Sequence, residues 1–143
     1  MKKIIIILVI TLVIVSTMFY IYYNYKADVR QAKIENMKYE QYKDKEITGL
    51  ELATVINKAI DQNEKNKINK NNKGIYIDNK QNSINIDIKF IDNDEVYNME
   101  TIYKSKIENF ISYYRLIKFK CVKVEYHDLT KKIKQMKFEQ ITQ

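Results

Sequence analysis

The chain of 143 residues has no proline or tryptophan, two glycines, and only one cysteine and one histidine. A single cysteine excludes an internal disulfide. It also argues against a bacterial lipoprotein, because Cys121 does not follow the apolar N-terminal run. The 23 lysines against two arginines, with 14 asparagines, indicate a genome biased toward A and T codons. Much of the lysine content therefore reflects codon usage, and the net charge of +7 is compatible with a mild attraction to anionic lipid headgroups or an anionic wall polymer.

Charge is absent from the whole stretch between Lys3 and Lys26. Residues 4–23 would rise about 30 Å as a helix, which matches the hydrocarbon thickness of a bilayer. Their many β-branched side chains would favour a buried strand in water, but a lone strand in lipid leaves its backbone groups unpaired. We therefore expect one transmembrane helix over 4–23.

Polar groups within and after this run fit the same interpretation. The hydroxyls of Thr11, Ser16 and Thr17 can bond to carbonyl groups one helical turn earlier. Four tyrosines at the C-terminal end predict the membrane interface, where a ring lies among acyl chains while its hydroxyl reaches water. They are Tyr20, Tyr22, Tyr23 and Tyr25.

Two other interpretations of the apolar run are weaker. A cleaved signal peptide would have a shorter apolar region ending in small residues, whereas bulky aromatic residues occupy this position. A buried helix of a soluble protein is the other alternative. We favour an uncleaved anchor, with residues 1–3 in the cytoplasm and the rest outside, because large downstream domains translocate regardless of charge. The first partner is then the lipid bilayer, and nucleic acid is not expected as a ligand.

Residues 24–46 are polar and rich in helix-forming side chains, so we expect the membrane helix to continue as a stalk. A loose heptad pattern runs along it, interrupted by Asn36. The other positions are Tyr22, Tyr25, Val29, Ala32 and Tyr39. Two heptads are too few to establish a coiled coil. A stalk that is solvated or packed on its own domain is favoured over self-association through this seam.

The folded domain is expected to occupy residues 47–143. Thr48 and Glu51 have the spacing of a capping box, which predicts the start of a helix. An apolar stripe follows at helical spacing, which predicts that this helix packs on a sheet. The stripe consists of Leu52, Val55, Ile56, Ala59 and Ile60. The polar tract 63–73 reads as a loop ending at the turn of Gly74.

Strand signals follow this loop. Strict alternation over 83–91 predicts a half-buried strand with Ile84, Ile86, Ile88 and Phe90 on one face. Short strands at 75–78 and 96–101 would complete a three-stranded antiparallel meander. The acidic cluster 92–95 lacks the ligand spacing of a calcium loop and is interpreted as a hairpin turn.

The last third of the domain predicts a helix and a hairpin. Ser105 and Glu108 repeat the capping-box spacing before a second amphipathic helix, while the periodicity of residues 99–104 fits strand and helix alike. We expect the strand to extend to Thr101.

The final hairpin is expected at 119–127 and 133–141. Val122, Val124 and Tyr126 are assigned to one face and Met136 and Phe138 to the matching face of the second strand. The outward set then mixes both signs of charge, which suits pairing in water. It consists of Lys123, Glu125 and His127 opposite Gln135, Lys137 and Glu139.

These elements predict an α+β domain, an antiparallel sheet of about five strands covered by two amphipathic helices. The sequence identifies no catalytic, cofactor-binding or metal-binding residues, and Cys121 is expected to be a buried inert thiol. The expected function is that of a single-pass membrane protein serving as a binding or structural accessory subunit at the cell envelope, with an envelope protein as partner. A membrane-tethered hydrolase is the alternative, with His127 and either Asp128 or Glu125 as candidates.

The overall plan, an apolar N-terminal helix leading into an α+β head, resembles pilin-type subunits. The short basic leader ending in glycine and the glutamate near the start of the apolar helix, which such subunits carry, are missing here. The resemblance adds a divergent pilin-like subunit as a third alternative.

Overall fold

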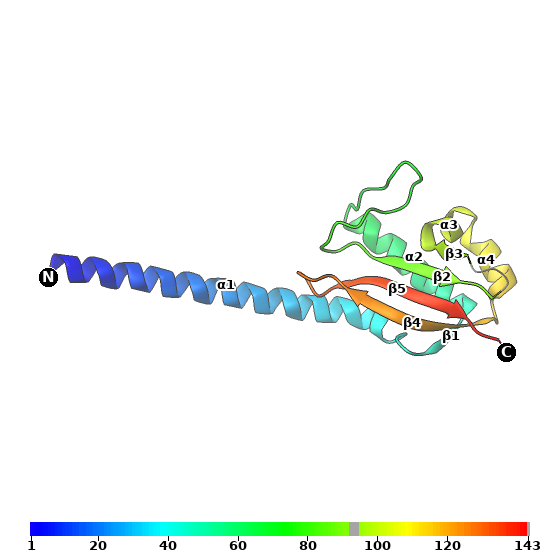
Figure 1. The fold of residues 1–143 in the computed structure, drawn as a ribbon, viewed down its shortest axis with the longest axis horizontal. Coiled ribbons are helices and arrows are strands. Elements are labelled where there is room, and N and C mark those ends of the chain that lie inside the picture. Colours follow the sequence, from blue (N-terminus) through cyan, green and yellow to red (C-terminus); the bar gives the residue numbers. More distant parts are fainter. Residues whose placement is uncertain (92–94, 143) are drawn as a thin grey trace.

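A long helix projects from a small α+β domain in the computed structural model, which describes residues 1–91 and 95–142 (Figure 1). Helix α1 spans Lys2–Glu40 without interruption, so the expected span and most of the expected stalk form one rod. The remaining elements are β1 (Glu46–Thr48), α2 (Gly49–Lys65), β2 (Asn85–Lys89), β3 (Val96–Asn98), α3 (Met99–Lys104), α4 (Ile107–Tyr114), β4 (Lys118–Tyr126) and β5 (Ile133–Gln140).

The five strands form one sheet in the order β1-β4-β5-β2-β3. Strands β2 and β5 run parallel, whereas the other three pairings are antiparallel. The expectation of an antiparallel sheet was therefore wrong at its centre. Alternating apolar residues reveal which face of a strand is buried, but they do not specify which strand lies beside it.

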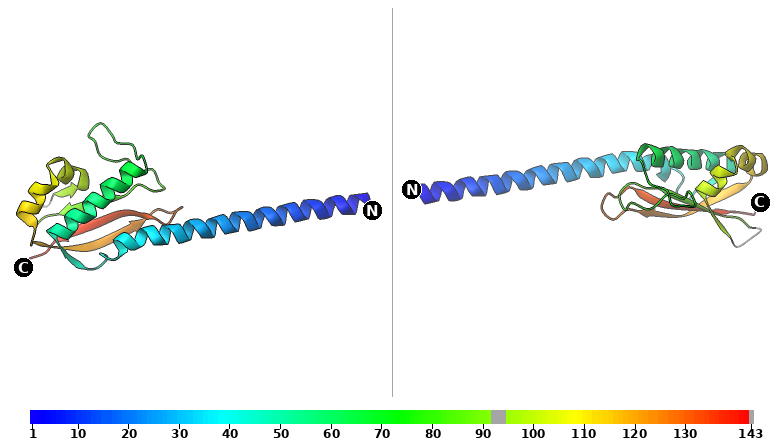
Figure 2. Two further views of the ribbon diagram at one scale, coloured as in Figure 1. Left: turned by 180° about the vertical axis from the view of Figure 1, so that it is seen from behind. Right: turned by 90° about the horizontal axis from the view of Figure 1, so that it is seen from above.

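The helices of the domain lie on one side of the sheet, together with the C-terminal end of α1 (Figure 2). Helix α2 starts with the predicted capping box, in which the Glu51 amide lies 3.3 Å from the Thr48 hydroxyl and the Thr48 amide donates to Glu51 at 2.7 Å. All five residues of the predicted stripe on α2 are buried. Each large apolar side chain buried in this way contributes about 1.5–3 kcal/mol to folding.

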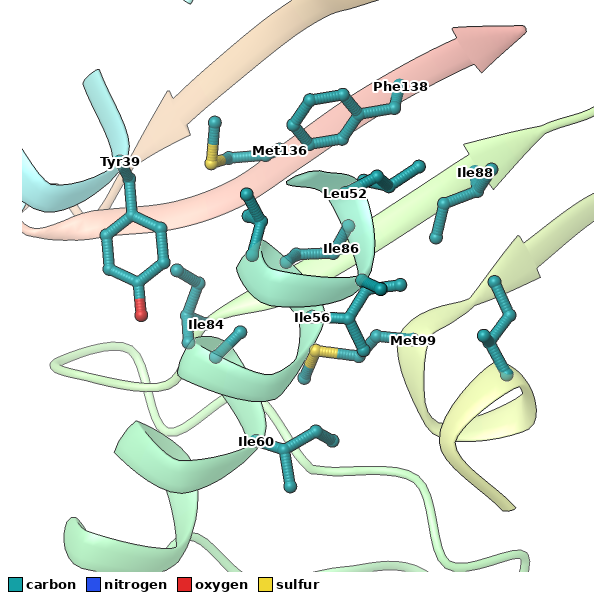
Figure 3. Packing of buried hydrophobic residues seen from close by; sticks show 14 of the residues in the cluster. Tyr39, Leu52, Ile56, Ile60, Ile84, Ile86, Ile88, Met99, Met136 and Phe138 are labelled. Carbon is teal, nitrogen blue, oxygen red and sulfur yellow. The ribbon is translucent and has the colours of Figure 1, made fainter. Parts of the chain in front are cut away.

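The core lies between α2 and the central strands. Ile84, Ile86 and Ile88 are fully buried, as the alternation predicted, although β2 is shorter than the predicted strand. Figure 3 shows α2 residues such as Leu52 and Ile56 packed among isoleucines of β2 and residues of β5. The parallel register places Met136 beside Ile86 and Phe138 beside Ile88, and all four side chains are buried.

Two parts of the predicted meander were wrong. The first predicted strand, 75–78, is absent from the sheet, and the last one ends three residues earlier than predicted. Tyr76 forms only an isolated bridge with Lys70, and residues 75–78 contribute no strand to the sheet. Strand β3 ends at Asn98, whose side chain accepts a hydrogen bond from the Thr101 amide at 2.9 Å and caps α3. The cap decides the ambiguous stretch in favour of helix. The acidic cluster at 92–95, interpreted as a turn, lies largely outside the described residues.

The second predicted capping box was also wrong. Ser105 closes α3, and its hydroxyl donates to the Ile102 carbonyl at 3.0 Å. Lys106 then adopts a left-handed conformation with φ of 67°, and α4 begins at Ile107 without a side-chain cap. A residue that ends one helix cannot at the same time supply the extended N-cap of the next.

The predicted final hairpin is formed by β4 and β5, and its register places Lys123 opposite Lys137 and Glu125 opposite Gln135. An irregularity between Cys121 and Lys123 changes which residues face the core. Phe119 and Cys121 are buried and Val122 is exposed, so the predicted inward set was wrong at Val122. Beyond the irregularity, Val124 is half-buried against the core as predicted, whereas Tyr126 is exposed. Such a bulge adds one residue to a strand and reverses the alternation beyond it.

Candidate functional site

The first half of α1 is exposed on every side. Its large apolar side chains from Ile4 to Tyr23 are between 45% and 73% exposed. By length and composition α1 could cross a membrane, and it is the one helix of this kind in residues 1–91 and 95–142. Membrane crossing itself stays a prediction, but so much bare apolar surface has no stable place in water.

The hydroxyls of the serine and the two threonines in this half are satisfied within the helix, as predicted. Thr11 donates to the Ile7 carbonyl at 2.9 Å, and Ser16 and Thr17 make the equivalent bonds four residues back at 2.8 and 2.7 Å. No polar group of these side chains therefore needs water or a partner helix, which is the condition for a span that faces lipid alone.

The last third of α1 is built into the domain. Ala32, Asn36 and Tyr39 are buried with at most 7% exposure, and they are the last three positions of the predicted heptad seam. This part of the stalk packs on its own domain, which is the alternative that the sequence favoured. Tyr22 and Tyr25 remain exposed.

Asn36 connects α1 to the β4–β5 hairpin through two hydrogen bonds. Its side-chain amide donates to the Lys131 carbonyl at 2.8 Å, and its carbonyl oxygen accepts from the Ile133 amide at 2.8 Å. The two bonds hold α1 to the backbone at the start of β5. Asn63 of α2 binds the backbone of Ile84 in the same manner, at 2.8 and 2.9 Å, so each helix holds one of the two central strands through a buried asparagine.

Three further contacts surround Asn36. The Tyr39 hydroxyl donates to Gln62 of α2 at 2.8 Å, and burial raises the pKa of Tyr39 above its usual range. The Tyr126 hydroxyl donates to Glu40 at 3.1 Å. Lys132 and Glu35 form an ion pair at 2.8 Å. We call this set, with Asn36, the junction; it fixes the direction of α1 relative to the sheet.

His127 was predicted to lie on a solvated face of the sheet. This prediction was wrong, since the side chain is buried and only 2% exposed. Its Nε2 lies 2.7 Å from the Ser83 carbonyl oxygen, and since a carbonyl can only accept, Nε2 carries the proton. Its Nδ1 lies 3.8 Å from an Asp78 carboxylate oxygen, beyond hydrogen-bonding distance. In the described part of the chain, neither Asp128 nor Glu125 bonds to this ring.

Ser83 and Asp78 do not form a hydrolytic arrangement with His127. The Ser83 hydroxyl donates to Asp78 at 3.1 Å rather than to the imidazole, and Ser83 is 1% exposed. A nucleophile needs a base that takes its proton and a face open to substrate. The cluster instead joins the residue 78–83 loop to the β4–β5 turn.

Cys121 is 1% exposed and free, as expected of an inert buried thiol. Burial raises the pKa of this thiol, which lowers the fraction of reactive thiolate at neutral pH. Among the residues that the structure describes, no group of three or more His, Cys, Asp or Glu side chains could hold a metal ion.

An uncharged groove of about 500 Å³ lies at the end of the domain remote from α1, between β3, α3 and α4. Phe90 occupies its floor with ring centroids 5.4 Å from Tyr97 and 4.9 Å from Tyr114. Tyr113 on its rim is 80% exposed. The remaining lining residues are Thr101, Ile102, Ser105, Asn109 and Phe110. We call this the distal groove.

Sequence reasoning missed the distal groove, because its residues come from three elements, one of which was assigned to the wrong secondary structure. The junction carried one usable signal: Asn36 is a polar residue at an otherwise apolar seam position. Comparisons of the chain with protein-family models, with curated proteins and with solved structures found no match.

Proposed function

We propose that this chain is a single-pass membrane protein whose domain lies outside the cytoplasm and acts as a binding or structural accessory subunit of the cell envelope. The observation that carries the proposal is the continuity of α1, a single helix of 39 residues with bare apolar surface at one end and a buried junction at the other. A removable signal peptide would have no reason to be rigidly continuous with the domain.

The geometry gives the anchor a further property, which is orientation. Nine residues separate Tyr23 from Ala32, a rise of about 14 Å along the helix. The domain therefore lies next to the bilayer rather than at the end of a flexible tether. Such an arrangement suits a subunit that must meet an envelope partner at a defined height and angle.

The distal groove is the surface proposed for that partner, an envelope protein that inserts apolar side chains. No charged residue lines the groove, and five of its nine lining residues are aromatic: Phe90, Tyr97, Phe110, Tyr113 and Tyr114. Aromatic enrichment and depletion of charge characterise the centres of protein interfaces. The opposite, open face of the sheet carries mixed charge instead, with pairs such as Asp87 beside Lys137.

The hydrolase alternative is weaker on chemical grounds. The one buried histidine binds a backbone carbonyl, and the nearby serine hydroxyl is bonded to Asp78, so the known contacts of this cluster serve packing. The pilin-like alternative predicts association of many copies through α1, and the experiment below separates it from the proposal.

Anchoring is tested by fractionating cells that express the full chain with a C-terminal tag. We expect the intact chain, with residues 1–23 present by mass, to remain in the membrane pellet after an alkaline carbonate wash. Protease added outside the cytoplasmic membrane should remove the tag. A soluble product, or one lacking its first two dozen residues, would refute the anchor; a protected tag would reverse the orientation.

Partner binding is tested with a photo-crosslinking amino acid at Tyr113, and at Val122 as a control that is exposed on β4 outside the distal groove and the junction. We expect an adduct with one envelope protein from position 113 only. A ladder of multiples of the chain's own 17.2 kDa would favour the pilin-like alternative. Adducts of equal yield at both positions would contradict a specific role for the distal groove.

A further inference from the structure

The β4–β5 turn lies beside α1 at the level of the interfacial tyrosines. Figure 1 shows this turn pointing back along α1 toward the N-terminus. A cleft of about 300 Å³ is lined jointly by Tyr25 and Val29 of α1 and by Leu129 and Thr130 of the turn. For a helix along the bilayer normal, Tyr25 and Val29 lie about 3 and 9 Å beyond Tyr23, the expected end of the span.

This height coincides with the lipid headgroups. The polar region on each side of the hydrocarbon core is about 5–8 Å thick. Leu129, at the tip of the turn, is 73% exposed although it is apolar. A leucine in this position is unfavourable in water and favourable at the boundary between headgroups and acyl chains.

The loop at residues 78–83 belongs to the same edge. The Thr130 hydroxyl donates to the Gln81 carbonyl, and the Asp78 carboxylate pairs with Lys134 of β5 at 2.9 Å. These contacts hold the loop and the turn together, so that Lys80 and Lys131 flank Leu129 as exposed cations. Both adopt left-handed conformations, with φ of 62° and 58°.

The charges on this edge favour an anionic surface. Lys80 and Lys131 have no carboxylate partner within residues 1–91 and 95–142, and Lys26 and Arg30 are exposed on the adjoining turns of α1. The exposed acidic groups at the same level are Asp28 and Asp128. A Lys or Arg side chain near an anionic membrane surface gains about 1 kcal/mol.

We propose that the β4–β5 turn is a second membrane contact, in which Leu129 inserts into the headgroup layer and Lys80 and Lys131 bind anionic phospholipid headgroups of the bilayer that holds α1. The inference rests on the proposed membrane anchor. Together, the helix and the turn define two points on the bilayer, and Asn36 rigidly connects them. The domain is therefore fixed in tilt, and the distal groove faces away from the membrane.

The chain contains no tryptophan, so a single introduced tryptophan reports the depth of one position. Leu129→Trp is compared with Leu116→Trp, a matched leucine that is 75% exposed between α4 and β4. Nine residues of β4 separate the two ends of the strand, about 30 Å. Tyr22→Trp reports insertion of α1. The full-length variants are reconstituted in vesicles of phosphatidylcholine and phosphatidylglycerol containing acyl-brominated lipid.

We expect Leu129→Trp to show blue-shifted emission and to lose most of its fluorescence to the brominated lipid, whereas Leu116→Trp remains unquenched. Omitting phosphatidylglycerol, or introducing Lys80→Glu with Lys131→Glu, should reverse most of the quenching at position 129. Quenching of Tyr22→Trp without quenching at 129 would overturn this inference alone. Quenching at 129 that is independent of phosphatidylglycerol would overturn the assignment to anionic lipid. An unquenched Tyr22→Trp would refute the membrane anchor.

Discussion

Helix α1 has two regions that share one backbone and differ in their surroundings. From Ile4 to Tyr23 its large apolar side chains are bare on all sides, whereas from Val29 to Glu40 only one narrow stripe is covered. The covered positions, Ala32, Asn36 and Tyr39, are small or polar, and the bare positions are mostly isoleucine, valine and leucine. Along α1, apolar character therefore marks the region for which we propose contact with lipid, while contact with the domain depends on hydrogen bonds and close approach.

The difference teaches that exposure and hydrophobicity have to be interpreted together. A helix that is apolar all round is typically buried in protein or in a membrane. The described part of the domain does not cover the apolar part of α1. The docked region gains specificity from the two bonds of Asn36, which an apolar side chain could not replace. The following variants should affect one region and leave the other unchanged.

The largest effect is expected from Ile10→Lys with Ile14→Lys. A lysine near the centre of a span raises the free energy of insertion by about 2.5–3.5 kcal/mol on insertion scales, so the pair should abolish stable anchoring. The measurement is the share of the chain in the carbonate-washed pellet. The thermal midpoint of the domain should not move, because neither residue contacts it. Ile10→Leu with Ile14→Leu is the control, and retention of the lysine variant in the pellet would contradict the anchor.

For Asn36→Ala we expect the domain to lose stability while membrane anchoring stays unchanged. The substitution leaves the buried Ile133 amide and the Lys131 carbonyl without partners, which should lower the free energy of unfolding by about 2–4 kcal/mol. Urea unfolding of the full chain in detergent micelles measures the change, while fractionation should be unaffected. The neighbouring Met37, 62% exposed, supplies the control Met37→Ala. Equal stability of the two variants would show that the junction does not hold α1.

A smaller effect concerns pH and the edge formed by the 78–83 loop and the β4–β5 turn. Partial burial of Asp78 opposes ionisation, but the Lys134 ammonium group, the Lys80 amide and the Ser83 hydroxyl outweigh it and lower the pKa of Asp78 to about 2. Because the folded pKa lies below the unfolded value, this stabilisation is present above about pH 4 and is lost as the pH falls toward 2.

Asp78→Asn should therefore lower the free energy of unfolding by about 1–2 kcal/mol at pH 7 and by much less at pH 2. The difference between variant and parent, measured by urea unfolding at both pH values, isolates this carboxylate from the others. A difference that did not shrink with falling pH would show that ionised Asp78 is not what stabilises the edge.

The smallest effect is expected from glycine substitutions at two lysines, one at each end of the domain. Lys106 and Lys131 both occupy left-handed conformations, which disfavour side chains with a Cβ atom. Lys106→Gly and Lys131→Gly should each raise the free energy of unfolding by about 0.5–1 kcal/mol, after the added flexibility of the unfolded chain is deducted. Only Lys131→Gly should also weaken the quenching of Leu129→Trp by vesicles. A loss of stability in both variants would mean that the lysine side chains contribute packing that outweighs the backbone strain.

Local patterns were sufficient for several elements. The spacing of Leu52, Val55 and Ile56 with the Thr48 cap specified α2, because capping and amphipathicity act within a few residues. The alternation of Ile84, Ile86 and Ile88 specified the buried face of β2 for the same reason. The stretch 99–104 was assigned in part to a strand, since its periodicity fits strand and helix alike. The Asn98 cap and the packing of Met99 and Ile102 into the core selected α3.

Local sequence patterns were also insufficient to predict the candidate functional sites. Burial of Cys121 followed from its strand-like surroundings, but the burial of His127 did not, because His127 lies just beyond the end of β4 and contacts the backbone of Ser83, 44 residues earlier in the chain. The distal groove brings Phe90, Tyr97 and Phe110 together from positions that no periodicity connects. The edge with Leu129 likewise depends on where the turn lies relative to α1.

The amino-acid sequence by itself determined an uninterrupted apolar helix, its polar continuation, and the amphipathic elements of a small α+β domain, because these depend on the order of side chains within one or two turns. The tertiary structure alone decided the parallel pairing of β2 with β5, the docking of α1 through Asn36, and the placing of Leu129 beside Tyr25. These features join segments that lie up to about a hundred residues apart. They form because the chain must bury its isoleucines and pair its buried amides at the same time.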